Sequence, residues 1–107
     1  MERMAEFPGG LDSLNSYLQR NLHYPNAPLP WPGLKGKVFV SFTVLRTGQI
    51  AHAHVERGVN PKLDAEALRV VRAMPAWKPG EQFGQPVAIV YTLPITFLLD
   101  ADTTGSQ

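Results

Sequence analysis

The spacing of apolar residues predicts an amphipathic helix that starts after Asn60 and ends before Pro75. Its apolar side chains recur every three or four positions, which is the period of one helix face. Asn60 suits the N-cap and Pro61 the first helical position, while Pro75 disfavours helical geometry at the residue before it. The apolar stripe consists of Leu63, Ala67, Val70, Val71 and Met74. The other elements must therefore supply an apolar surface for this stripe and for Trp77, which follows it closely.

A second helical stripe lies near the N-terminus and ends at Tyr24 and Pro25, because the residue before a proline avoids helical geometry. The stripe consists of Leu11, Leu14, Tyr17, Leu18 and Leu22. Residues 1–8, which precede it, are predicted to be a short flexible tail. Residues 26–32, which follow it, are rich in proline and are predicted to be an ordered, stiffened loop with Trp31 anchored on the domain.

Alternating side chains predict three strands, over residues 36–45, 49–57 and 86–99. The first strand is apolar on both faces, which is typical of a central strand. A tight turn at Gly48 joins it to the second, where Ala51, Ala53 and Val55 point inward and His52 and His54 outward. The third strand follows a loop over residues 81–85, and its apolar face is formed by Val87, Ile89, Tyr91, Leu93, Ile95 and Phe97.

The order helix, strand, strand, helix, strand predicts an α+β domain of two layers with a three-stranded antiparallel sheet. We expect the first strand in the middle, giving the order 2-1-3, because it is apolar on both faces and antiparallel pairs are the commoner kind. Pro94 favours an edge position for the third strand, since proline cannot donate to a ladder. That strand would then present a long apolar edge with free backbone groups.

The composition is that of one ordinary globular domain over all 107 residues, with residues 100–107 as a polar tail. A formal net charge of +1 gives no field that would draw the domain to nucleic acid. The absence of cysteine excludes disulfides and thiolate chemistry. The first residues do not resemble a secretory signal, and no stretch approaches the roughly 20 apolar residues that a membrane span needs.

Histidines give the only hint of a metal site. His52 and His54 share a strand face, and His23 lies upstream. A zinc site needs three or four ligands with supporting partners, and no cysteine or neighbouring acidic cluster completes such a set. We interpret these histidines as solvent-facing. The sequence shows no catalytic serine motif, no Ser/His/Asp set and no phosphate-binding glycine loop, so it predicts neither a catalytic residue nor a cofactor.

Several short motifs together resemble the C-terminal domain of the TonB energy-transducer family. They are Tyr24-Pro25, Gly36-Lys37-Val38, Gly48, Asp64-Ala65-Glu66-Ala67, Trp77-Lys78-Pro79-Gly80 and Tyr91-Thr92-Leu93-Pro94-Ile95. The likeness is closest to the variety with a leading Phe7-Pro8-Gly9-Gly10 and an amphipathic helix, and it covers about nine-tenths of the chain. None of these motifs is catalytic, which suits a binding module.

The resemblance implies a non-catalytic periplasmic domain. Full-length relatives have an N-terminal membrane helix held by inner-membrane proton-motor proteins, then a proline-rich spacer, then this domain. The domain grips a TonB-dependent outer-membrane transporter and drives uptake of iron chelates, vitamins or glycans. This chain carries neither the membrane helix nor the spacer, so we expect an excised domain or a soluble relative. Residues 26–32 also depart from the pattern, since many relatives continue helically there.

An extended transporter segment is expected to add as a further strand to the free edge of the third predicted strand. The residues expected to contact it are Val87, Ala88, Ile89, Val90, Tyr91, Thr92 and Leu93. The resemblance adds His23, Tyr24 and Pro25. The same edge predicts a homodimer, because an edge that accepts a peptide can also accept its own copy.

Two other classes of function stay open from the sequence. A structural or adaptor domain, of the TolA type or attached to a membrane sensor-peptidase, would bind proteins without transducing energy. An enzyme with a site that the sequence does not reveal is the second alternative. A membrane helix and spacer upstream would favour the transducer, and an upstream HExxH motif would favour the sensor-peptidase.

Overall fold

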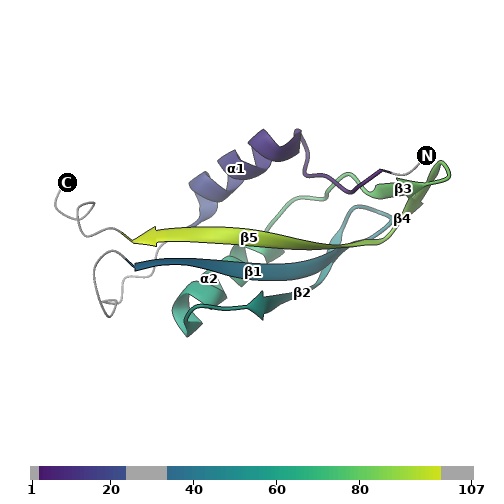
Figure 1. Cartoon of the computed structure of the whole chain (residues 1–107). Helices are drawn as coiled ribbons and strands as arrows, with labels where there is room; N and C mark the ends of the chain where they lie inside the picture. The colour runs from purple at the N-terminus through teal and green to yellow at the C-terminus, as the bar shows by residue number, and fades with distance from the viewer. Residues whose placement is uncertain (1–2, 24–33, 100–107) are drawn as a thin grey trace.

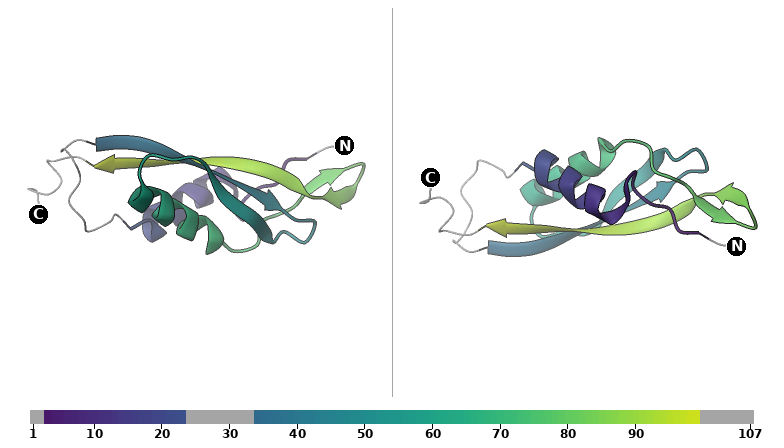
Figure 2. Two further views of the ribbon diagram at one scale, coloured as in Figure 1. Left: turned by 90° about the horizontal axis from the view of Figure 1, so that it is seen from below. Right: turned by 90° about the horizontal axis from the view of Figure 1, so that it is seen from above.

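The helices and strands form two layers in the computed structural model, which describes residues 3–23 and 34–99 (Figure 1). Both helices cover the same face of a three-stranded antiparallel sheet (Figure 2). In chain order the elements are α1 (Gly10–Asn21), β1 (Leu34–Val44), β2 (Ile50–Arg57), α2 (Pro61–Arg72), β3 (Gly80–Gln82), β4 (Gln85–Val87) and β5 (Ile89–Leu99). The α+β fold class predicted from the sequence is confirmed.

The sheet has the order β2-β1-β5, so the strand that is apolar on both faces lies in the middle. β1 pairs with β5 without a break, from Leu34 opposite Leu99 to Val44 opposite Ile89. The predicted order 2-1-3 is therefore confirmed, as is the edge position of the strand that contains Pro94. The residues of β1 that form the floor of the core are Val38, Val40, Phe42 and Val44.

Local signals in the sequence set the limits of α2. The Asn60 side chain caps the helix by accepting a hydrogen bond from the Leu63 N–H at 2.9 Å, and Pro61 occupies its first position. The whole predicted stripe, from Leu63 to Met74, is buried. α1 packs beside it, because the Tyr17 hydroxyl donates to the Val70 carbonyl oxygen at 2.9 Å. The two helices thus form one layer over the sheet.

Trp77 is the centre of an aromatic cluster that joins the two layers. Its side chain is only 3% exposed, and its ring lies 5.0 Å from Tyr91, 5.3 Å from Phe42 and 5.8 Å from Phe7, measured between ring centroids. Its backbone N–H donates to the Gly48 carbonyl oxygen at 2.8 Å. Gly48 has a φ of 91° and lies against the Trp77 backbone, so a side chain would collide there. The turn between β1 and β2 is thereby fixed to the residue that closes the core.

The prediction of a flexible tail over residues 1–8 is wrong for residues 3–8. Glu6 pairs with Lys78, and Arg3 with Glu81, through backbone hydrogen bonds of 2.7–3.0 Å. Phe7 is buried on Trp77. This segment is ordered because it extends the β3–β4 hairpin by strand pairing and covers an aromatic surface that would otherwise be exposed to solvent. The tail predicted over residues 100–107 lies outside the described residues, as does the proline-rich loop with Trp31.

Two further details differ from the sequence predictions. The loop predicted over residues 81–85 is a tight hairpin whose two turn residues, Phe83 and Gly84, have φ of 53° and 77°. The third strand begins later than predicted, because it is interrupted at Ala88 and the piece before it belongs to that hairpin. Leu11 was placed on the apolar stripe of the first helix, but it is 68% exposed, whereas Leu14, one turn later, is buried.

Candidate protein-docking edge

The outer edge of β5 is long and free of charge. Residues 89–97 include no charged side chain, and β1 pairs with them along the opposite edge. Within the part of the chain that the structure describes, no strand pairs with the outer edge over residues 89–96, which faces α1 (Figure 1). Unpaired N–H and C=O groups on such an edge form a template for another extended chain.

The opposite edge, on β2, is built differently. Its pairing with β1 has two register shifts, and His52 adopts a φ of 56° beside one of them. His54 lies 3.2 Å from Glu56. A hydrogen bond with the His52 carbonyl oxygen, together with Glu56, raises the pKa of His54. Bulges and charges are the usual protection of an edge strand against pairing, so β5 is the edge suited to docking.

A groove of about 480 Å³ accompanies the docking edge, between α1 and the second half of β5. The helix contributes Asn15, Leu18, Gln19 and Leu22, and the strand contributes Pro94, Ile95 and Thr96. α1 is held there by its buried side, where Leu14 and Tyr17 pack into the core. A chain added to β5 would therefore run beside this helix rather than over open solvent.

A charged clasp holds the C-terminal end of α1 to α2. The Glu66 carboxylate accepts a hydrogen bond from the His23 backbone N–H at 2.6 Å and two from Arg69 at 2.7 and 2.8 Å. Arg69 also donates to the Asn21 carbonyl oxygen at 2.7 Å, so it satisfies a carbonyl at the helix end. The Arg69 hydrogen bonds lower the pKa of Glu66, and that of the His23 N–H adds to the effect. The clasp thus fixes the position of the groove's helical wall.

Acid is expected to weaken this clasp. The pKa of Glu66 is depressed in the folded state, so its stabilisation is complete above the ordinary value of 4.5 and is lost as the pH falls through the folded-state pKa. We expect Glu66→Gln to lower the free energy of unfolding by about 1 kcal/mol near neutral pH, and the difference from the wild type to shrink in acid. Urea unfolding of both proteins across this pH range measures it.

A matched pair in an Arg69→Met background provides the control for this experiment. Because the main charge partner of Glu66 is then absent, the same Gln substitution should show a smaller dependence on pH. A difference between wild type and Glu66→Gln that stays constant from neutral pH into acid would contradict the clasp.

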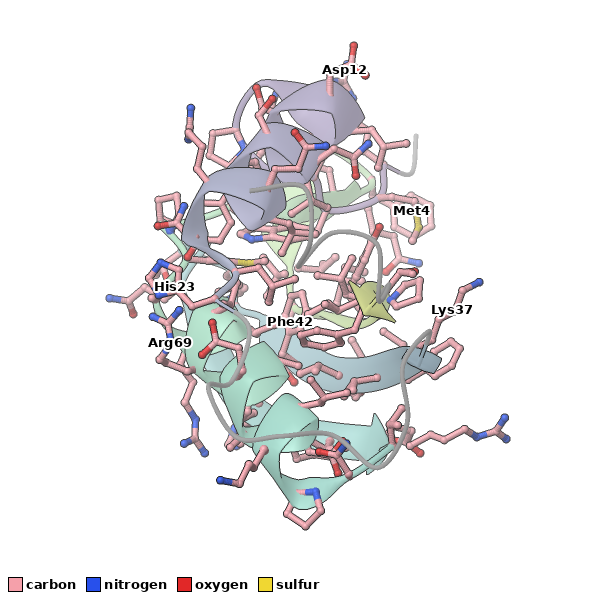
Figure 3. All side chains as sticks on the ribbon, turned by 90° about the vertical axis from the view of Figure 1, so that its left-hand side faces the viewer. Met4, Asp12, His23, Lys37, Phe42 and Arg69 are labelled. Carbon is pink, nitrogen blue, oxygen red and sulfur yellow. The ribbon has the colours of Figure 1, made fainter. Side chains whose placement is uncertain are left out.

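The structure separates the site residues that the sequence grouped together. Residues 89–93 lie on β5, but Val87 pairs with Gly80 in the β3–β4 hairpin, and Ala88 lies between the two strands. His23 lies beside Arg69, on the side of α2 (Figure 3). Tyr24 and Pro25 lie outside the described residues. The edge of β5 is therefore the part of the predicted site that keeps a continuous geometry.

Sequence reasoning missed the groove and the clasp. The Glu66 carboxylate contacts a residue 43 positions away. Nothing local to Glu66 signals that contact. The amphipathic pattern of α1 was visible, and the spacing of Asn15, Leu18, Gln19 and Leu22 could have indicated a second helix face.

Neither metal binding nor a membrane span finds support among residues 3–23 and 34–99. No three His, Asp or Glu side chains of this part gather closely enough to hold a metal ion. None of its helices has the length and apolar character required to cross a membrane.

These features define a small α+β domain whose sheet, over the described residues, has one bulged edge and one edge without a paired strand. The chain belongs to the family of TonB C-terminal domains: the family model described as "Gram-negative bacterial TonB protein C-terminal" matches residues 20–99. The search of curated proteins and that of solved structures each gave no match. Domains of this family are non-catalytic interaction domains of the periplasm that contact outer-membrane transporters.

Proposed function

We propose that this domain binds an extended N-terminal segment of a TonB-dependent outer-membrane transporter by strand addition to the outer edge of β5. In the full-length protein, an N-terminal anchor would link it to inner-membrane proton-motor proteins, and the bound strand would transmit force for uptake of iron chelates, vitamins or glycans. The observation that carries the proposal is the asymmetry of the sheet. One edge is bulged and charged, and the other is continuous and uncharged.

Strand addition suits a partner that must be gripped along its length. Each added residue pair contributes backbone hydrogen bonds, so the bound segment resists a pull shared over several contacts. The partner segment becomes ordered as it binds, and the ordering entropy keeps the affinity modest, on the order of micromolar. Such an affinity permits repeated capture and release.

NMR shift mapping with synthetic peptides from the N-terminal segments of outer-membrane transporters tests the proposal. We expect the perturbed amides to cluster on β5, over residues 89–96, with weaker changes on α1 because the peptide runs beside it. The amides of β2 serve as an internal control, since the bulged edge should not respond. Perturbation centred on His52 and His54, with β5 unchanged, would overturn the proposed edge.

Self-association through the same edge is a second expected property. An uncharged edge that accepts a peptide can also accept the β5 of another copy, so we expect a dimer whose fraction rises with concentration. Sedimentation velocity over a wide concentration range measures it. Thr92→Lys places a charge on the exposed side of β5 and should reduce dimerisation, whereas Thr47→Lys, in the exposed β1–β2 turn, should not. A wild-type monomer at every concentration would contradict this expectation.

A further inference from the structure

We infer that α1 makes the groove beside β5 a pocket that selects an uncharged, branched apolar side chain in the bound strand. The inference rests on the proposed function, because it assumes that an extended chain occupies the edge of β5. It adds a determinant of sequence choice, which backbone pairing alone does not provide.

One face of α1 packs into the core, and an adjacent face lines the groove. Leu14 and Tyr17 are buried against the core. The residues that line the groove, Asn15, Leu18, Gln19 and Leu22, follow the spacing i, i+3, i+4 and i+7, which places them along one adjacent face. Among residues 3–23 and 34–99, β5 is the element that lines the groove opposite this second face. The second face is therefore available to a chain that lies on β5.

The pleat of an added strand directs side chains into this groove. Successive residues of a strand point to opposite faces of the sheet, so every second side chain of the bound segment turns toward the helix-covered face. There it would lie over Ile95, which is 1% exposed and forms the floor, and against Leu18 and Leu22, which are half-buried. Burial of an aliphatic side chain on this surface is favourable.

The chemistry of the groove excludes charge. None of the described residues that line it is ionisable, so a charged side chain would lose water there without gaining a partner among them. Asn15 and Gln19 stand exposed at the rim, and each amide offers both donors and an acceptor. The partner segment that fits is therefore an extended, uncharged stretch with an aliphatic residue at the groove position and polar neighbours.

Part of the groove lies outside the family match. The family match begins at residue 20, so Asn15, Leu18 and Gln19 precede it. The clasp between Glu66 and Arg69 then fixes the helix that carries them. Partner choice would accordingly depend on a helix that lies mostly outside the family match.

Guest peptides test the selectivity of the groove. The probes are acetyl-Thr-Val-Thr-Xaa-Thr-Val-Thr-amide peptides in which Xaa is Leu, Thr, Glu or Lys, titrated into the whole chain and followed by NMR. We expect the Leu guest to bind about tenfold more tightly than the Thr guest, as partial burial of an aliphatic side chain implies. The Glu and Lys guests should both bind more weakly than the Thr guest.

Introducing a charged residue at Gln19, on the rim of the groove, gives a readout that does not depend on packing. In Gln19→Glu the Lys guest should gain roughly two- to fivefold over the Glu guest, and in Gln19→Lys the preference should reverse, since a pair at an exposed rim is worth that much. Gln19 is exposed, so both variants should fold. Ser16→Glu and Ser16→Lys, exposed on α1 but outside the groove, are the matched controls and should leave the preference unchanged.

The outcomes separate the groove from the edge. Shifts on β5 with the Leu preference and the charge reversal support the groove. Shifts on β5 with equal affinity for all guests, and no effect of the Gln19 variants, would contradict the proposed selectivity of the groove but not the proposed docking at the edge of β5. If no probe shifted the resonances of β5, both the proposed docking at its edge and the proposed selectivity of the groove would be wrong.

Discussion

Replacing Trp77 by alanine is expected to lower the free energy of unfolding by about 3–5 kcal/mol, the usual cost of removing a large buried aromatic side chain. Its side chain contacts three other aromatic rings, from the N-terminal segment, β1 and β5. Their edge-to-face arrangement adds to the energy of burial. The loss is a large part of the roughly 5–15 kcal/mol that holds a domain of this size together.

Thermal and urea unfolding measure this effect directly. A change of 1 kcal/mol moves the melting temperature of such a domain by about 4–8 °C, so the variant should melt far below the wild type. Phe83→Ala is the matched control, since Phe83 is 81% exposed at the tip of the β3–β4 hairpin and should change stability by less than about 1 kcal/mol. Equal losses in the two variants would contradict the central position of Trp77.

Sequence reasoning succeeded where the signals were local. The limits of α2 follow from Asn60, Pro61 and Pro75, which act on their own neighbours, and its stripe is buried as the spacing predicts. The middle position of β1 follows from its two apolar faces. The edge of β5 could therefore be predicted from the sequence, and with it the main feature of the candidate docking site.

The failures concern contacts between distant segments. Residues 3–8 have no periodic pattern, and they are ordered because they pair with Lys78 and Glu81 and because Phe7 packs on Trp77. The β3–β4 hairpin was missed because Phe83 occupies a left-handed position that bulky residues rarely adopt. The groove depends on the angle at which α1 meets the sheet, and the Glu66 clasp helps to set that angle. Helix packing of this kind leaves little trace in a single sequence.

The residues of a bound peptide form two alternating sets, one with N–H groups toward β5 and one with N–H groups toward solvent. Removing the N–H groups of the first set is expected to abolish binding, while removing those of the second set should not. In an edge strand, the N–H groups of alternate residues point toward the neighbouring strand, and those of the residues between them point to solvent. Each net hydrogen bond contributes about 0.5–1.5 kcal/mol, so the loss of three should weaken binding by roughly 10- to 1,000-fold. The uncharged edge of β5 offers few other polar contacts that could replace them.

Two N-methylated versions of the acetyl-Thr-Val-Thr-Leu-Thr-Val-Thr-amide peptide make this test without changing a side chain. One carries N-methyl groups at positions 2, 4 and 6, and the other at positions 3, 5 and 7; proline at the same positions would remove the same donors. Fluorescence anisotropy with the whole chain measures both affinities, and the unmodified peptide is the reference. One version should fail to bind and the other should keep most of its affinity, because the N–H groups of only one alternating set of residues face β5. If both versions bound as well as the reference, backbone pairing would not be the source of affinity and the proposed docking at β5 would be wrong.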